Sequence, residues 1–151
     1  MKFKIQDDMI VFGTGALGYG LIEVLWRGST HPTMLLAGGV CLLSLGEVNR
    51  RMAGQPLLYR CVAGGSLITG VELAIGAVCN LGLGMNIWDY SGIPLNFRGQ
   101  ICLLFSVAWA LLSIAAMLLE GAMRRALAAG HGIRPEIRRV VSSLQNAVIE
   151  K

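Results

Sequence analysis

The sequence predicts an all-α integral membrane protein, in which a bundle of four transmembrane helices precedes a C-terminal cytoplasmic amphipathic helix. Its composition is apolar: 54% of the 151 residues are hydrophobic and only 15% are charged, and the mean hydropathy is +0.61. A transmembrane helix needs about 20 apolar residues to cross about 30 Å of hydrocarbon. Such a span must be helical, because its backbone groups find no water in the lipid. Four apolar runs have roughly this length: 9–26, 33–48, 61–84 and 101–119.

The first run is rich in glycine, which lets membrane helices approach one another closely. The glycines are Gly13, Gly15, Gly18 and Gly20. The turn that follows, 27–32, is short, so the first two spans should form a hairpin. Ser29 or Thr30 is expected to cap the second helix, with Pro32 in its first turn.

The second run ends in a charged cluster, in which Glu47 precedes Arg50 and Arg51. We interpret this cluster mainly as a helix end at the membrane surface. The third run carries small or polar residues at four-residue spacing, which predicts a contact stripe with another helix. These residues are Gly65 and Thr69, followed by Gly76, Asn80 and Gly84.

The fourth run is almost wholly apolar and is expected to be the most lipid-exposed or scaffold-like helix. Beyond it, the segment 130–135 contains two glycines and a proline and predicts a break. Apolar residues then recur at helical spacing beside Arg138 and Arg139, so the tail should be an amphipathic helix on the membrane surface or against a partner. We therefore divide the chain into a transmembrane domain, 1–121, and a basic tail, 122–151.

The positive charges predict the orientation in the membrane. With four spans, the segments 1–8, 49–60 and 120–151 lie on one side, and they hold eleven of the 13 Lys and Arg residues. The opposite loops hold only Arg27 and Arg98. This bias places both termini of a multi-pass protein in the cytoplasm. It also explains the net charge of +4 without a nucleic-acid partner.

Two carboxylates within the runs mark candidate site residues, because ionisable groups in hydrocarbon usually face a cavity or a partner. Glu23 and Arg27 are four residues apart and share one helix face. An ordinary interfacial ion pair would also explain them. Glu72 lies near the middle of the third run, where it must be protonated, paired or lining a wet cavity. Ser66, Thr69 and Asn80 are its expected partners.

The polar segment 86–100 between the last two runs has far richer chemistry than a connector needs. The predicted topology brings it to the same face as Glu23, Arg27 and His31. Trp88 and Tyr90 would also fit an ordinary aromatic belt, but Asp89 and Asn96 do not follow from one. We expect the segment to pack into the mouth of the bundle, with Trp88 buried and Asp89 in contact with Arg27. The candidate substrate-binding residues are Glu23, Arg27, Glu72, Trp88, Asp89, Tyr90, Asn96 and Gln100.

Other kinds of site are not indicated. Cys41, Cys61, Cys79 and Cys102 have no metal-ligand spacing, and we expect neither a metal nor a cofactor. The motif Gly13-Thr-Gly-Ala-Leu-Gly18 matches a dinucleotide-binding pattern by letter, but it lies inside a membrane span with no preceding strand. The chain has no Walker lysine, so it cannot itself be an ATPase of that type.

Several motifs together resemble the CmpB-like family of small bacterial membrane proteins, which are catalogued as type IV ABC-transporter permeases. The resemblance runs from about Tyr19 to Trp109. It implies a multi-helix protein of the bacterial inner membrane. The motifs are Tyr19-x-x-x-Glu23-x-x-x-Arg27-Gly-x-x-His31, Ile68-Thr69-x-x-Glu72, Trp88-Asp-Tyr-Ser91, Pro94-Leu-Asn96 and Gly99-Gln-Ile-Cys-Leu103.

Three functions fit these observations. The first is a permease-like component that binds or moves a small polar solute through a polar site open to the outer face. Four helices enclose little space, so we expect a homo-oligomer or a partner subunit. The second is a membrane enzyme acting on a lipid or headgroup at the outer face, with Asp89 or Glu23 as general base and His31 assisting. The third is a non-transporting accessory or assembly protein, whose polar residues only join helices.

Overall fold

The computed structural model describes the backbone of residues 2–149 and the side chains of residues 4–130. It is all-helical apart from a two-stranded ribbon. In chain order the elements are α1 (Lys2–Arg27), α2 (Pro32–Arg51), α3 (Leu57–Ile75), the π-helix η1 (Gly76–Gly82), β1 (Asn96–Phe97), β2 (Ile101–Cys102) and α4 (Leu103–Ile149). Four helical segments are long and apolar enough to cross a membrane: Lys4–Arg27, Pro32–Arg51, Leu57–Gly82 and Leu103–Gly130. The predicted all-α fold with four helices of membrane-spanning length is confirmed, and the cytoplasmic position of the tail stays a prediction.

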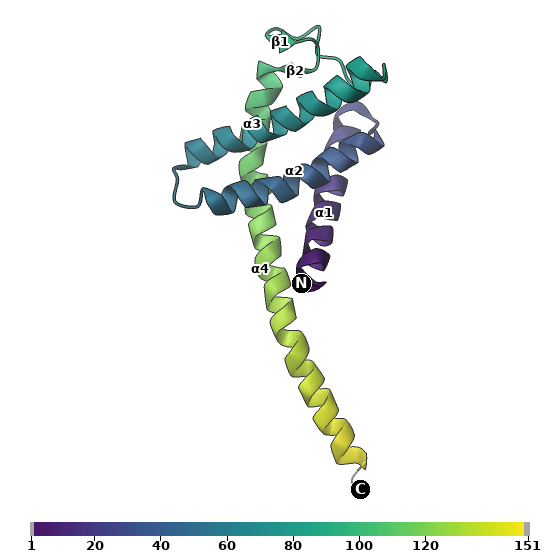
Figure 1. The fold of residues 1–151 in the computed structure, drawn as a ribbon, viewed down its shortest axis with the longest axis vertical. Coiled ribbons are helices and arrows are strands. Elements are labelled where there is room, and N and C mark those ends of the chain that lie inside the picture. The colour runs from purple at the N-terminus through teal and green to yellow at the C-terminus, as the bar shows by residue number, and fades with distance from the viewer. Residues whose placement is uncertain (1, 150–151) are drawn as a thin grey trace.

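The helices pack as two crossed pairs. α1 packs chiefly on α2, and α4 packs chiefly on α3. α2 and α3 run side by side and cross α4 at a steep angle (Figure 1). The turn 28–31 and the segment 83–102 meet at one end of this bundle, where Nη1 of Arg27 donates to the carbonyl oxygen of Ile87 at 2.7 Å. We call this the loop end.

Glycines bring the paired helices close together. A Cβ atom on Gly15 of α1 would lie 2.5 Å from the carbonyl oxygen of Gly38 on α2, and one on Gly65 of α3 would lie 2.6 Å from Cβ of Ala110 on α4. No other residue can occupy either position without moving a helix. The contact roles predicted for Gly15 and Gly65 are therefore confirmed, whereas Gly13 and Gly18 face open space.

The cap of α2 differs from the predicted one. Nδ1 of His31 accepts the backbone N–H of Thr33 at 3.3 Å, with Pro32 in the first turn as predicted. Neither Ser29 nor Thr30 caps the helix. Thr30 instead donates its hydroxyl to Glu23 at 2.5 Å, which turns its side chain toward α1.

α3 continues into one wide turn before it ends. In η1 the backbone hydrogen bonds join residues five apart instead of four. The N–H of Leu83, for example, donates to the carbonyl oxygen of Val78 at 2.9 Å. Such turns recur at functional sites. This one turns Asn80, 7% exposed, toward the segment 83–102.

α4 continues as one helix well past the fourth apolar run. The predicted break at 130–135 is wrong, because the backbone is helical throughout Leu103–Ile149. A proline in a helix removes one backbone hydrogen bond, and the residues before this segment, including Ala126, Leu127 and Ala128, are strong helix formers. The predicted amphipathic pattern of the tail involves side chains that lie outside those described here.

A buried charge cluster joins three helices at the opposite end of the bundle, which we call the basic end. Glu120 of α4 is 1% exposed, and its Oε1 accepts from Nη1 of Arg50 on α2 and from Nε of Arg124, both at 2.9 Å. Arg124 also pairs with Asp8 of α1 at 2.5 Å. Sequence reasoning missed Glu120, although the i,i+4 spacing to Arg124 could have indicated it.

Candidate functional site

Two adjoining cavities lie between the helices. The larger, which we call the mouth cavity, has a volume of about 670 Å³ and is lined from α1, the segment 83–102 and α4 by residues that include Glu23, Trp88 and Tyr90. The smaller, the core cavity, has a volume of about 230 Å³ and is lined by all four helices. The two cavities share four lining residues: Tyr19, Ile22, Met34 and Trp109.

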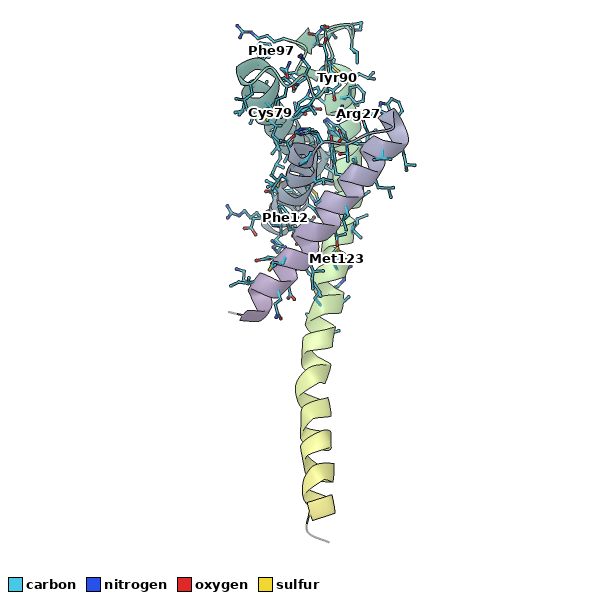
Figure 2. All side chains as sticks on the ribbon, turned by 90° about the vertical axis from the view of Figure 1, so that its right-hand side faces the viewer. Phe12, Arg27, Cys79, Tyr90, Phe97 and Met123 are labelled. Atoms are coloured by element: carbon cyan, nitrogen blue, oxygen red, sulfur yellow. The ribbon has the colours of Figure 1, made fainter. Side chains whose placement is uncertain are left out.

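Glu23 and Arg27 form the polar edge of the mouth cavity. Nη2 of Arg27 pairs with Oε1 of Glu23 at 2.6 Å, and Oε2 of Glu23 accepts from Thr30. The other terminal guanidinium nitrogen of Arg27, Nη1, donates to the carbonyl oxygen of Ile87. The predicted ion pair is confirmed, and the pair also attaches the segment 83–102 to α1. Figure 2 shows Arg27 and Tyr90 near one another at this end of the molecule.

Glu72 connects three elements. Its Oε1 accepts the hydroxyl of Tyr90 at 2.7 Å, and its Oε2 accepts the indole N–H of Trp109 at 3.0 Å. The partners expected from sequence, Ser66, Thr69 and Asn80, do not bind it. They lie on the same helical segment as Glu72, whereas the true partners come from other elements.

Burial raises the pKa of the Tyr90 phenol above its ordinary value, and the nearby carboxylate of Glu72 raises it further. The phenol therefore keeps its proton and remains a donor to Glu72.

A second set of buried bonds fixes the segment 83–102. The side-chain amide of Asn80 donates to the carbonyl oxygen of Trp88 at 3.0 Å and to Oε1 of Gln100 at 2.9 Å. Its Oδ1 accepts the N–H of Ile87 at 2.7 Å. The indole of Trp88, 8% exposed, donates to the carbonyl oxygen of Gln100 at 2.9 Å. The predicted packing of the segment and the burial of Trp88 are confirmed.

Asn96 organises a turn within that segment. Its amide donates to the carbonyl oxygen of Ile93 at 2.7 Å, and its Oδ1 accepts the N–H of Gly99 at 3.0 Å. Gly99 has a φ of 68°, a backbone conformation that favours glycine. The hydrogen bonds of Asn96 and Gln100 therefore shape the segment, and neither residue lines the mouth cavity or the core cavity.

Asp89 is exposed at the rim of the mouth cavity. Its carboxylate accepts the backbone N–H of Ser91 at 2.8 Å and the hydroxyl of Ser91 at 2.9 Å. These two hydrogen bonds lower the pKa of Asp89, and the one from the backbone N–H has the larger effect. The predicted contact with Arg27 is wrong, because that guanidinium is already bound by Glu23 and Ile87, and Asp89 finds closer donors two residues away.

The structure brings five of the eight candidate residues to the mouth cavity: Glu23, Arg27, Trp88, Asp89 and Tyr90. Glu72 lines the core cavity directly behind Tyr90 and Trp109. Whether these residues bind a solute stays a prediction.

Sequence reasoning missed the aromatic contribution of α1 and α4. The rings of Tyr90 and Phe105 are stacked with centroids 4.8 Å apart, and Trp109 lies 6.2 Å from Phe105 and 5.9 Å from Tyr19. These four rings form a continuous wall. Phe105 and Trp109 are four residues apart on α4, a spacing that could have indicated one shared face.

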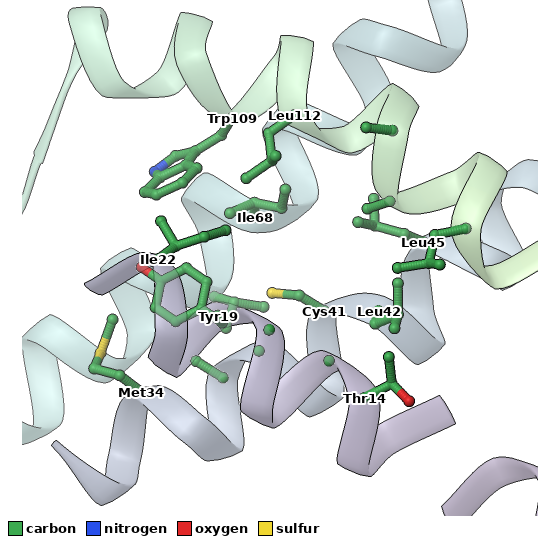
Figure 3. Close-up of a pocket in the computed structure, with 18 of the residues that line it drawn as sticks. Thr14, Tyr19, Ile22, Met34, Cys41, Leu42, Leu45, Ile68, Trp109 and Leu112 are labelled. Atoms are coloured by element: carbon green, nitrogen blue, oxygen red, sulfur yellow. The ribbon is translucent and has the colours of Figure 1, made fainter. Parts of the chain in front are cut away.

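The core cavity is almost wholly apolar. Tyr19 and Ile22 of α1 and Trp109 and Leu112 of α4 extend into the same space, with the sulfur of Cys41 between them (Figure 3). The core cavity is partly open, and its apolar lining suits an apolar group.

Among the residues with described side chains, no three His, Cys, Asp or Glu groups lie together as a metal site would require. His31 uses its Nδ1 in the cap of α2. The arrangement therefore offers binding chemistry: an aromatic wall, one ion pair and an exposed carboxylate.

Comparison with known sequences agrees with the architecture. The model of the CmpB family, described as "Putative ABC-transporter type IV", matches residues 4–144. This range extends the resemblance beyond the segment from Tyr19 to Trp109 and into the tail. No curated protein and no solved structure matches the chain. With 141 of its 151 residues matched, this protein with four helices of membrane-spanning length belongs to the CmpB family.

Proposed function

We propose that this protein is the membrane component of a transporter and binds a small solute in the mouth cavity. The observation that carries the proposal is the mouth cavity itself, in which five residues selected for their chemistry line one space of about 670 Å³. Ligand sites in proteins have volumes of about 300–1,000 Å³ and combine apolar walls with a few polar groups. Glu23, Arg27 and Asp89 supply such groups here.

The loop end faces the outside of the cell in this proposal. The basic end carries most of the positive charge, including Arg50, Arg51 and Arg124, and positive loops remain on the cytoplasmic side. Solute would then enter the mouth cavity from outside the inner membrane. The carboxylate of Glu72, held by Tyr90 and Trp109, lies between this entrance and the core cavity.

A transporter of this kind needs an energy source. The sequence has no Walker lysine, so a nucleotide-hydrolysing partner subunit, or a proton taken up by Glu72, would supply it. A second copy of the chain or a partner subunit would also enclose the transport path, since four helices leave little room. Light scattering of the purified protein would give the number of copies.

A dry core without cavities would favour the accessory function, and the two cavities count against it. An enzyme would need Glu23 or Asp89 free to act as a base. Glu23 is held by Arg27 and Thr30, and Asp89 is held by Ser91. The geometry thus supports binding better than catalysis.

The test is ligand-induced stabilisation of the full chain purified in alkyl maltoside micelles. A panel of choline, neutral sugars, zwitterionic amino acids and short carboxylates is added, and the melting temperature is measured. A ligand at 100 times its Kd stabilises a protein by about 2.7 kcal/mol. We expect at least one class to stabilise the native chain and to lose this effect in Glu23→Gln. Glu47→Gln, which alters an exposed carboxylate at the basic end, is the control. Stabilisation by no member of the panel would contradict the proposal.

A further inference from the structure

We propose that the mouth cavity recognises an organic ammonium cation, so that the solute is a quaternary or highly substituted amine. This inference rests on the proposed function and names its substrate class. Four observations support it: the aromatic residues gathered at the cavity, the arrangement of their rings, the balance of charge, and the adjoining core cavity.

Aromatic side chains are concentrated at this one cavity. The chain has three Trp, three Tyr and four Phe. All three tryptophans, two of the tyrosines and one phenylalanine line the mouth cavity: Tyr19, Trp26, Trp88, Tyr90, Phe105 and Trp109. Aromatic belts of membrane proteins lie at the lipid interface. Here rings from α1, α4 and the segment 83–102 converge on a shared space, which a belt does not require.

The rings adjoin one another along one wall of the cavity. The successive centroids of Tyr90, Phe105, Trp109 and Tyr19 lie 4.8, 6.2 and 5.9 Å apart. Tyr90 and Phe105 are stacked, so a cation does not fit between them and meets only the ring faces that the wall turns to the cavity. A cation is attracted to such a face within about 6 Å of the ring centroid, as in aromatic sites that bind quaternary ammonium groups.

The charge of the cavity also favours a cation. Two carboxylates, Glu23 and Asp89, and one guanidinium, Arg27, line it. Arg27 is neutralised by Glu23 at 2.6 Å, which leaves the charge of Asp89 facing the entrance. The bonds from Ser91 keep the pKa of Asp89 below its usual range, so this carboxylate is ionised at neutral pH. An anion would be repelled at the same place.

The core cavity can hold the apolar substituents of the cation. It adjoins the mouth cavity through Tyr19, Ile22, Met34 and Trp109, and its lining is apolar. The alkyl or aryl groups of a substituted amine can therefore leave water there, which favours binding.

The experiment compares two molecules of the same shape. Choline and 3,3-dimethylbutan-1-ol differ in that a carbon replaces the charged nitrogen, and butyrate serves as the anion. Binding to the full chain in alkyl maltoside micelles, which carry no ammonium group, is followed by tryptophan fluorescence, because every tryptophan lines the cavity. We expect saturable binding of choline that is at least tenfold tighter than binding of the alcohol, and no binding of butyrate.

Variants then assign the binding to the cavity, with radiolabelled choline measured by equilibrium dialysis. Asp89→Asn and Tyr90→Leu should each weaken binding by about tenfold. Tyr90→Phe, which keeps the ring, should retain most of the affinity that Tyr90→Leu loses. Glu47→Gln, a carboxylate at the basic end, should bind as the native chain does. Melting temperatures identify any variant that fails to fold. If one of Asp89→Asn and Tyr90→Leu does not fold, the binding measured for the other tests the inference.

Three results would overturn the inference. Equal affinity for choline and its neutral analogue would show that charge is not recognised. An equal loss in Asp89→Asn and Glu47→Gln would show that only the overall charge matters. Stabilisation by a sugar, amino acid or carboxylate in place of choline would remove the ammonium class while leaving the proposed function intact.

Discussion

Trp109 and Glu72 lie on different helices, and the indole N–H of Trp109 donates to Oε2 of Glu72 at 3.0 Å. An indole nitrogen can only donate, so this oxygen must act as an acceptor. The bond joins α4 to α3 at the boundary between the mouth and core cavities. It therefore ties helix packing to the wall of the proposed binding site.

Trp109→Phe tests that bond. The substitution keeps an aromatic ring but removes the donor, which leaves a buried carboxylate oxygen without one partner. We expect the free energy of unfolding to fall by about 1–3 kcal/mol. Tyr19→Phe is the matched control, since the hydroxyl of Tyr19 makes no hydrogen bond within the described part of the chain. Equal melting temperatures for the two variants would show that the bond contributes nothing.

Glu72→Gln tests a proton-linked role. Glutamine can accept from Trp109 with its oxygen and donate to Tyr90 with its amide, so the variant should fold. If Glu72 takes up a proton during solute handling, ligand binding by the native chain will depend on pH, and that dependence will disappear in the variant. The measurement is choline affinity between pH 5 and 8. Unchanged pH dependence in a folded variant would end the proton-coupling hypothesis.

Gly46→Ala tests the cluster at the basic end. A Cβ atom at this position would lie 2.1 Å from Cδ of Glu120, so the buried carboxylate must shift away from Arg50 and Arg124. Because both arginine side chains are partly exposed, we expect a loss of about 1–3 kcal/mol. Gly70→Ala is the control, because a Cβ atom there meets no neighbour and the effect should stay within about 1 kcal/mol. Comparable melting temperatures would mean that the cluster does not hold the helices together.

Ser91→Ala tests the ionisation of Asp89. The hydroxyl and backbone N–H of Ser91 lower the pKa of Asp89, and the variant loses the hydroxyl. A lowered folded-state pKa stabilises the fold above the unfolded value of about 3.9. This contribution disappears as the pH falls through the folded-state pKa. We expect carboxyl NMR titration to show a higher pKa for Asp89 in the variant. An identical titration curve would contradict the assigned cause.

Cysteine labelling tests the orientation. In a chain whose native cysteines are replaced, Ser29→Cys and Ser91→Cys should react with an impermeant reagent from outside the cell. Gly54→Cys and Gly132→Cys should react only after the membrane is opened, because the basic segments lie in the cytoplasm. Reaction of positions 54 and 91 from the same side would refute the four-span topology.

The four spans and the Glu23–Arg27 pair could be predicted because both depend on local sequence. Lipid forces each apolar run into a helix, and residues four apart share a helix face. The tertiary partners could not be predicted in the same way. Nothing near Glu72 in the sequence indicates Trp109, which is 37 residues away.

The partner of Asp89 and the burial of Glu120 were also not predicted from the sequence. Asp89 and Arg27 are brought to the same cavity, but each is bound by a partner nearer in the sequence, Asp89 by Ser91 and Arg27 by Glu23, so the expected contact between them does not form. Glu120 follows the last apolar run and therefore resembles an ordinary boundary residue. Its burial depends on the space left by Gly46 on another helix, which only the packing of α2 against α4 creates.

The length of α4 has a mechanical consequence. Its 47 residues extend over about 70 Å at 1.5 Å per residue, more than twice the roughly 30 Å of hydrocarbon that a bilayer offers. Phe105 and Trp109 line the mouth cavity at one end of this rod, and the other end stands clear of the bundle (Figure 1). A tilt of about 5° near Met117 would move the far end by about 4 Å. A helix of this length would therefore amplify a small tilt beside the cavity into a displacement of several ångström at its far end.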